Sequence, residues 1–155
     1  MHVLFATDLT EPPAAVRKVL RMTERLDGEL YVLHAISPQP TASAPLEPGM
    51  GGGFAPYDTY DPALEKHIQQ AEEHAFHEFL TDRFDRSVRA ALRQGKPAEV
   101  ILDDADEQNA DLILLCHRPQ SRLEKMLLGS TAGTVVRKAR RPTLLIPVLD
   151  EDEAS

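Results

Sequence analysis

The sequence predicts an α/β fold: a single doubly wound domain with a five-stranded parallel sheet and four helices. Short apolar runs, of which residues 112–116 are the clearest, lack the alternation of a half-exposed strand, so both faces of each strand must be covered. Segments with apolar residues at helical spacing separate these runs, which favours a parallel sheet between two helical layers. The 155 residues suit one domain with one core.

The first part of the chain contains two predicted strands, residues 3–6 and 30–33, on either side of a helix. Pro12-Pro13 suits the first turn of that helix, and Asp27-Gly28 suits its end. Between these points apolar or small side chains recur at helical spacing: Val16, Val19, Leu20, Thr23 and Leu26.

Residues 37–60 are rich in Pro, Gly, Ala and Ser and show no sustained period, which predicts a flexible excursion. Asp61-Pro62 is typical of a helix start. The following helix is expected to be long and amphipathic. Its apolar face consists of Leu64, Ile68, Ala71, Ala75 and Phe79.

The second half repeats the alternation of strands and helices. Val88, Ala90 and Leu92 alternate as in a strand, and Gly95-Lys96-Pro97 opens a third helix. The inward positions of that helix are Val100, Ile101 and Ala105. A strand over 112–116 and a last helix follow, the latter marked by Ala132, Val135, Val136 and Ala139. Pro142 ends that helix before a strand over 143–148. The domain spans 1–149, and 150–155 forms an acidic tail.

Composition excludes several classes of function. The formal charge of −8 and pI near 5.2 disfavour binding to nucleic acid or to an anionic membrane surface. No apolar run approaches the length of a membrane span, and the first residues lack the pattern of a secretory signal. We therefore expect a cytoplasmic protein. The single cysteine, Cys116, excludes a disulfide framework within the chain.

Several motifs together resemble the universal stress protein family over almost the whole chain. They are the stretches 3–8 (VLFATD), 33–35 (LHA), 95–101 (GKPAEVI), 110–113 (ADLI), and 127–130 (LLGS) through to Pro142. The resemblance implies a doubly wound domain like that of the adenine nucleotide alpha hydrolases. It also implies a ligand, namely an adenine nucleotide: ATP, ADP or AMP.

The glycine pattern of the nucleotide-binding family members is only partly kept. These members use Gly-x-x-Gly, nine further residues and then Gly-Ser or Gly-Thr. Counting back from Gly129 places Pro119 and Cys116 at the two earlier glycine positions. Proline has no N–H to donate and fixes its own φ, whereas glycine lets the backbone approach a phosphate closely. We therefore expect weak or no ATP binding.

A candidate nucleotide site remains. Free N–H groups at the start of the last helix favour an anion, and Arg118 and Arg122 could add positive charge. Asp8 follows the first strand, where open α/β sheets bind ligands. The candidate cofactor-binding residues are Thr7, Asp8, Ala35, Gly129, Ser130 and Thr131. The alternative interpretation is structural: Ser130 caps the helix, both arginines are solvated, and Asp8 forms hydrogen bonds in a turn.

Other chemically active side chains favour structural roles. His67 and His74 lie two helical turns apart, which is too far for a shared ion within one helix, so no metal site is expected. The basic cluster Arg137, Lys138, Arg140 and Arg141 complements the negative end of the last helix. Cys116 suits packing as a small apolar residue, although its position at a strand end also fits a redox sensor.

Two functional hypotheses remain. The first is a non-enzymatic stress-response module that acts through dimerisation and protein contacts. The second is a regulatory switch driven by adenine nucleotides, in which the excursion 37–60 responds to the ligand. No catalytic nucleophile and base occur at a recognisable spacing, so we expect no enzyme activity. The last strand, 143–148, is expected at a sheet edge, where it would join a homodimer.

Overall fold

The computed structural model describes residues 1–38, 61–84, 87–119 and 128–149. Within them, one sheet of five parallel strands is formed by β1 (His2–Thr7), β2 (Glu29–Ile36), β3 (Arg89–Gln94), β4 (Leu112–His117) and β5 (Thr143–Pro147). The helices of this part are α1 (Pro13–Arg25), α2 (Pro62–Arg83), α3 (Pro97–Glu107) and α4 (Ser130–Lys138). The predicted fold class is confirmed. The excursion lies outside the described residues from 39 onward, as does the acidic tail 150–155.

The strand order β3-β2-β1-β4-β5 places β1 at the centre of the sheet. The chain moves outward from β1 to β3, then returns to add β4 on the other side of β1 and β5 beyond it. In such sheets, the crevice outside the carboxyl ends of the two strands where the direction reverses is the usual ligand site. The fold therefore directs attention to the ends of β1 and β4.

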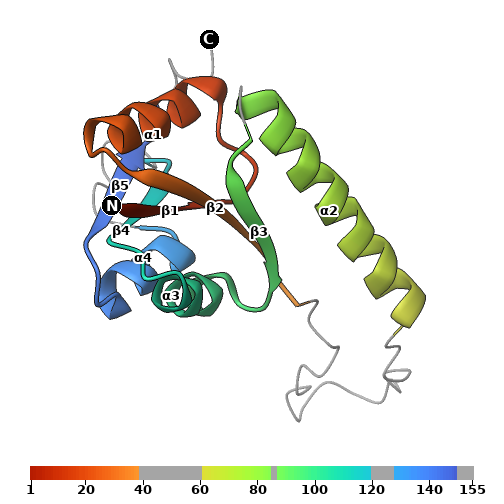
Figure 1. Cartoon of the computed structure of the whole chain (residues 1–155). Helices are drawn as coiled ribbons and strands as arrows, with labels where there is room; N and C mark the ends of the chain where they lie inside the picture. Colours follow the sequence, from red (N-terminus) through yellow and green to blue (C-terminus); the bar gives the residue numbers. More distant parts are fainter. Residues whose placement is uncertain (39–60, 85–86, 120–127, 150–155) are drawn as a thin grey trace.

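Two hydrophobic clusters, one on each face of the sheet, hold the helical layers in place (Figure 1). Leu4, Leu33 and Leu115 belong to the cluster that includes residues of α3 and α4. Their neighbours Val3, Val32 and Leu114 belong to the cluster that includes residues of α1 and α2. Successive strand residues point to opposite faces, and both faces are buried, so the apolar runs show no alternation.

The helix boundaries follow the predicted chemistry. Pro13, Pro62 and Pro97 each open a helix, where a missing N–H costs no hydrogen bond. Asp61 caps α2 by accepting a bond from the Ala63 amide at 2.9 Å. A left-handed residue ends both α1 and α3: Asp27 and Asn109 each have φ of 48°. The amides that follow them bond back to Thr23 at 2.9 Å and to Ala105 at 2.9 Å, which is the Schellman arrangement.

The predicted apolar face of α2 is partly wrong. Leu64 is 56% exposed and Ala71 is also exposed, whereas Phe76, which the prediction missed, is buried beside Phe79. Of the residues of α2, only those in its carboxyl-terminal half belong to the hydrophobic cluster on this face of the sheet. The helix is therefore longer than the surface it covers, and its first turns are free to be polar.

Three other apolar positions are more exposed than the sequence indicates. Val136 is 44% exposed on α4, and Leu26 lies at the exposed end of α1. Ala90 is exposed because β3 is an edge strand.

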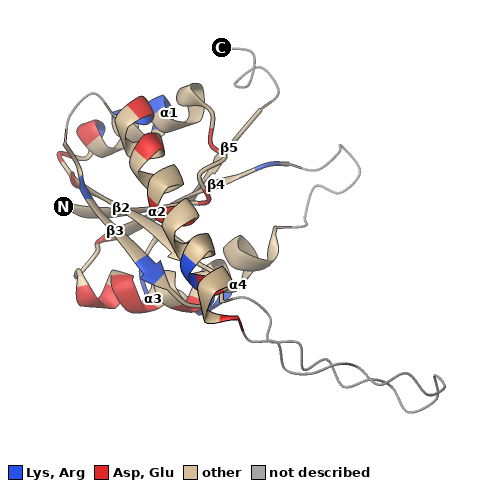
Figure 2. Ribbon diagram, turned by 90° about the vertical axis from the view of Figure 1, so that its right-hand side faces the viewer, with Lys and Arg blue, Asp and Glu red and all other residues tan. Residues whose placement is uncertain are grey.

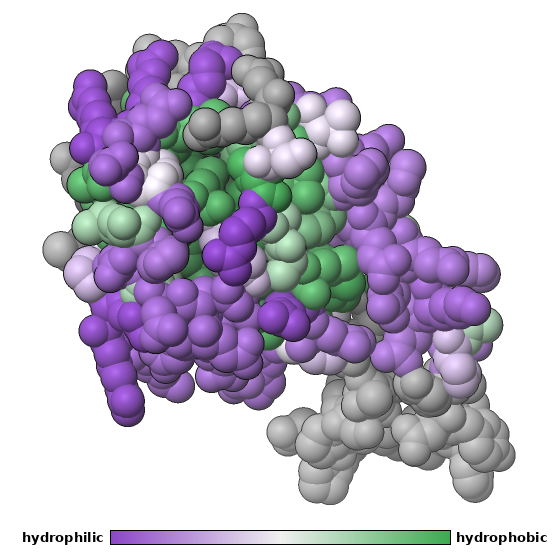
Figure 3. Space-filling model, viewed as in Figure 1, coloured by the Kyte–Doolittle hydropathy of each residue, from purple (hydrophilic) through white to green (hydrophobic). Residues whose placement is uncertain are grey.

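Apolar surface is visible between the helical layers near β3 (Figure 3). Acidic residues are frequent along α3 (Figure 2): Asp103, Asp106 and Glu107 are exposed, whereas Asp104 is buried. No helix in the described ranges combines the length and apolarity needed to cross a membrane.

Replacing Phe76 by alanine should lower the free energy of unfolding by about 3–5 kcal/mol, because it removes a buried ring. The matched change Leu64→Ala on the same helix should alter it by less than about 0.5 kcal/mol, because that side chain is largely exposed. Urea denaturation of both variants measures the difference. Equal losses would contradict the one-sided contact of α2 with the sheet.

Candidate functional site

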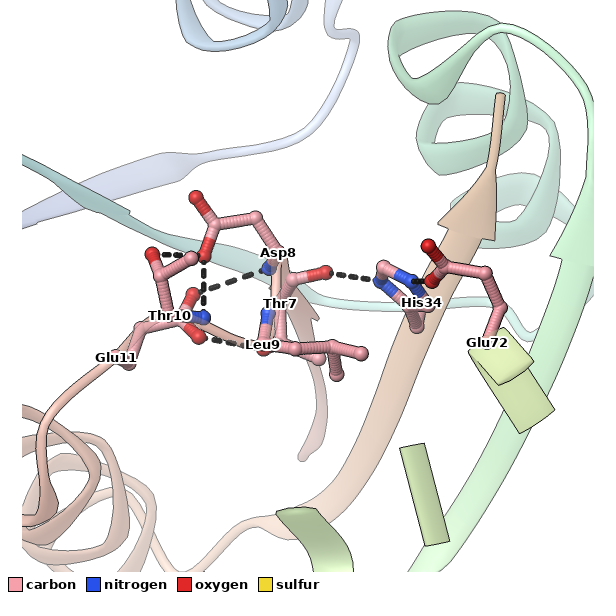
Figure 4. A network of polar contacts seen from close by, with 7 residues as sticks. All are labelled: Thr7, Asp8, Leu9, Thr10, Glu11, His34 and Glu72. Carbon is pink, nitrogen blue, oxygen red and sulfur yellow. Dashed lines mark hydrogen bonds and ion pairs between the residues drawn. The ribbon is translucent and has the colours of Figure 1, made fainter. Parts of the chain in front are cut away.

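The loop after β1 is held by hydrogen bonds within itself (Figure 4). Asp8 accepts bonds from the Thr10 amide at 2.9 Å and the Thr10 hydroxyl at 2.6 Å. The Thr7 hydroxyl donates to Glu11 at 2.6 Å and accepts from the Leu9 amide at 2.9 Å. These bonds hold Leu9 at φ of 69°, a conformation uncommon for a residue other than glycine. The turn role considered for Asp8 is therefore present, and its side chain remains exposed.

Glu11 is a buried carboxyl group, only 4% exposed. Burial, followed by the nearby charge of Asp8, raises the pKa of Glu11 to about 7, against the opposing effect of the Thr7 hydrogen bond. Its second oxygen accepts a longer bond from the Asp8 amide at 3.3 Å. A group that titrates near neutral pH thus stands beside the exposed Asp8 at the start of α1.

His34 connects the end of β1 to α2. Its Nδ1 lies 2.8 Å from the Thr7 carbonyl oxygen, and its Nε2 lies 2.8 Å from the Glu72 carboxylate. The Thr7 carbonyl and the Glu72 carboxylate therefore hold the imidazole through both of its ring nitrogens. The ring also packs on Phe76, with centroids 5.8 Å apart. Thus one ion pair and one aromatic contact attach α2 to β2 beside the loop.

Two cavities meet at the carboxyl ends of β1 and β4. The first, of about 360 Å³, lies between β1, β2, α2 and α3, and its wall includes His34, Ala35 and Glu72. The second, of about 380 Å³, lies against the start of α4 and the end of β4. They share five lining residues: Asp8, Glu11, Cys116, Thr131 and Ala132. We call the two together the cleft.

All six predicted site residues line this cleft. Thr7 and Ala35 line the first cavity, Gly129 and Ser130 line the second, and Asp8 and Thr131 line both. Their assignment to a ligand stays a prediction.

The start of α4 differs from the structural alternative considered for Ser130. Gly129 occupies the N-cap position and Ser130 is the first helical residue, with no side-chain cap bond. The hydroxyl of Ser130 therefore does not serve as the N-cap. Arg118 lines the second cavity and donates to the Thr10 carbonyl at 2.9 Å. Arg122 lies outside the described residues.

Cys116 lines both cavities and is half-buried. Burial, then the charges of Glu11 and Asp8, raise the pKa of its thiol to about 12. Since the thiolate is the reactive form, the environment opposes a redox role and agrees with packing. Pro119 is exposed at the end of the described strand-loop segment.

The remaining candidate side chains have local partners. His74 pairs with Glu78 at 3.2 Å, and no group of three potential metal ligands occurs among the described residues. In the basic cluster, Arg141 pairs with Asp106 at 3.1 Å and also donates to the Ala110 carbonyl. Arg137 lies 3.3 Å from the Thr134 hydroxyl.

The fold and the cleft define a doubly wound α/β domain with a cleft at the point where strand order reverses. A family model described as the universal stress protein family matches residues 1–147. The chain therefore belongs to the universal stress protein family, and the resemblance seen in the sequence is confirmed. As a member of that family it is a stress-response protein.

Relatives and solved structures agree with this assignment. A universal stress protein of Thermus aquaticus is 29% identical over 145 residues, covering 93% of this chain and 96% of that protein. Universal stress protein MJ0531 of Methanocaldococcus jannaschii is 23% identical, covering 85% and 72%. The structure of MJ0577 from the same organism aligns with a TM-score of 0.69 at 20% identity, over 96% of both chains. A universal stress protein solved in complex with cAMP aligns with a TM-score of 0.55 at 18% identity, over 94% and 95%.

Sequence reasoning missed Glu11, His34 and Glu72 as residues of the cleft. His34 lies within the quoted family stretch, and its position at the end of a buried strand could have marked it. Glu11 precedes two prolines at a helix start, where an acidic residue is ordinary. Glu72 is one of many polar residues on α2, and only the packing of that helix reveals its partner.

Substituting Glu11 by glutamine should change how stability depends on pH. The pKa of folded Glu11, about 7, lies above the value of 4.5 that is ordinary for a glutamate carboxyl group. The stabilisation from the protonated group is therefore complete below pH 4.5 and is lost as pH rises to 7. The loss is on the order of 3 kcal/mol. Glu11→Gln should remove this component, so the variant should gain stability relative to wild type at pH 8 but not at pH 4.5.

Urea denaturation at several pH values measures this effect. Glu107→Gln, a change at an exposed carboxylate on α3, is the control and should follow the wild-type profile. A Glu11→Gln profile parallel to that of wild type would show that Glu11 titrates in the folded protein as it does in the unfolded chain.

Proposed function

We propose that this protein is a non-enzymatic stress-response module of the cytoplasm that acts through a homodimer and protein contacts and binds ATP weakly or not at all. The observation that carries this proposal is the identity of two residues on the side of the cleft where phosphates would lie. Cys116 and Pro119 stand where nucleotide-binding relatives are expected to have glycines, and the Cys116 side chain lines both cavities. Backbone approach to a triphosphate is correspondingly reduced.

The charge of the first cavity supports weak triphosphate binding. Its described lining residues include Asp8, Glu11 and Glu72 but no lysine or arginine. The imidazole of His34 in its wall is already paired with Glu72. Like charges close together in a poorly solvated site repel strongly, so a ligand with several phosphates meets an unfavourable potential.

A nucleotide-driven switch is the second candidate, and a specific observation favours it. Gly129, Ser130 and Thr131 begin α4 and line the second cavity, where free amides and the helix dipole stabilise an anion. A structural relative was solved with cAMP. The cleft thus keeps a place for one phosphate group even without the glycines.

Restoring glycine should strengthen ATP binding. The double variant Cys116→Gly/Pro119→Gly should bind ATP at least about tenfold more tightly than wild type, a gain of about 1.4 kcal/mol. Isothermal titration calorimetry measures both affinities. The control Cys116→Ala/Pro119→Ala trims the same side chains without the backbone freedom of glycine, and it should gain less. A submicromolar wild-type dissociation constant, or ATP bound to the purified protein in native mass spectrometry, would favour the switch instead.

The edge strand β5 supports the dimer. The Ile113 amide bonds to the Pro142 carbonyl and the Val148 amide to the His117 carbonyl, so even-numbered residues of β5 face β4. Alternation then turns the backbone groups of Thr143 and Leu145 toward the open edge. An open edge is a template for another strand, and a two-fold copy closes it.

Leu145→Pro should convert the dimer to a monomer, because it removes an outward N–H without breaking the ladder to β4. Leu145→Ala shortens the same half-buried side chain but keeps the N–H, so it should stay dimeric. Light scattering at micromolar concentration gives the mass of each. Ile146 is unsuitable for this test, since it is only 6% exposed and belongs to the core. A monomeric wild type would refute the proposed assembly.

A further inference from the structure

Glu11 occupies the wall common to both cavities, and its carboxyl group has no positive partner among the residues that the structure describes. Its carboxyl group is held by the Thr7 hydroxyl and the Asp8 amide, and no ion pair to it occurs within the described part of the chain. Its side chain lines the first and the second cavity. An ionised carboxylate in this position is both buried and uncompensated, which is unfavourable.

Charged and titratable groups reach this region from each neighbouring element that carries them. On the acidic and neutral side are Asp8 in the loop after β1, Glu72 on α2 and Cys116 on β4. On the basic side are Lys18 on α1, His34 on β2, His117 at the end of β4, Arg83 on α2 and Arg118 beyond β4. Arg83 donates to the backbone carbonyl of Glu11 at 3.3 Å rather than to its carboxylate.

An anion in the second cavity must share that space with Glu11. The amides at the start of α4 attract a phosphate group, while an ionised Glu11 in the same cavity repels it. A protonated Glu11 removes the repulsion and gains an O–H that can donate. We propose that the cleft binds a nucleotide with a single phosphate group together with one proton, which Glu11 takes up. This inference rests on the nucleotide binding considered under the proposed function.

Two other groups in the cleft, His34 and Cys116, are poorly suited to take up that proton. His34 already faces two acceptors through its two ring nitrogens. The thiol of Cys116, with its pKa raised to about 12, stays protonated throughout the neutral range. The pKa of Glu11, about 7, leaves the group partly ionised before binding, so a nearby anion can shift it toward the protonated form.

Calorimetry with cyclic AMP at pH 7.5, in two buffers with different ionisation enthalpies, tests the proposal. Cyclic AMP is a phosphodiester whose single charge is constant around neutral pH, so any proton taken up comes to the protein. If binding raises the pKa of Glu11 by one unit, uptake is about half a proton per ligand, and affinity is about sevenfold higher at pH 6 than at pH 8.5.

Two variants assign the proton. Glu11→Gln imitates the protonated group, so it should bind cyclic AMP without proton uptake and keep its affinity at pH 8.5. Glu72→Gln alters the pair formed by His34 and Glu72 in the first cavity, and this variant should retain the proton uptake. Binding by wild type without uptake, unchanged uptake in Glu11→Gln, or no binding at millimolar ligand at pH 6 would each overturn the proposal. None of these results would bear on the dimer or on the weakness of ATP binding.

Discussion

The arrangement of the cleft depends on Thr7, the last residue of β1. Its hydroxyl bonds to Glu11 and to the Leu9 amide, and its carbonyl accepts from His34. His34 in turn holds Glu72. One residue therefore sets the turn into α1 and connects β1 to β2 and, through the imidazole, to α2. Side chains from β1, β2, α2 and the loop before α1 meet because the central strand ends there.

This arrangement places buried negative charge where an anion would bind. The helix start at Gly129 to Thr131 attracts phosphate, whereas Asp8 and Glu11 across the second cavity oppose it. Under the proposed function, this balance separates the chain from a strong triphosphate binder. In the proposed binding mode a ligand must either carry little charge or alter the charge of the protein, so the protonation of the cleft becomes part of its selectivity.

The fold was predictable because its determinants are local. Buried runs such as 112–116 and prolines such as Pro13 and Pro97 specify strands and helix starts without knowledge of distant contacts. The buried face of α2 could not be predicted, because the sequence does not show that the helix extends beyond the sheet. Leu64 is exposed and Phe76 is buried for this reason. The pairing of His34 with Glu72, 38 residues apart, likewise depends on how α2 docks. Thr7, Asp8 and Thr131 could be predicted as residues of the cleft because strand ends and helix starts are visible in the sequence.

The ends of α1 and α3 have a consequence for protein engineering. Both helices finish on a left-handed residue that is not glycine, Asp27 in one case and Asn109 in the other. An L side chain is strained in that conformation, and aspartate also sits unfavourably near the negative end of a helix. Glycine at either place would relieve the strain by up to about 1 kcal/mol. A more thermostable variant could therefore be made at these two positions, which lie outside the cleft lining, without changing the cleft.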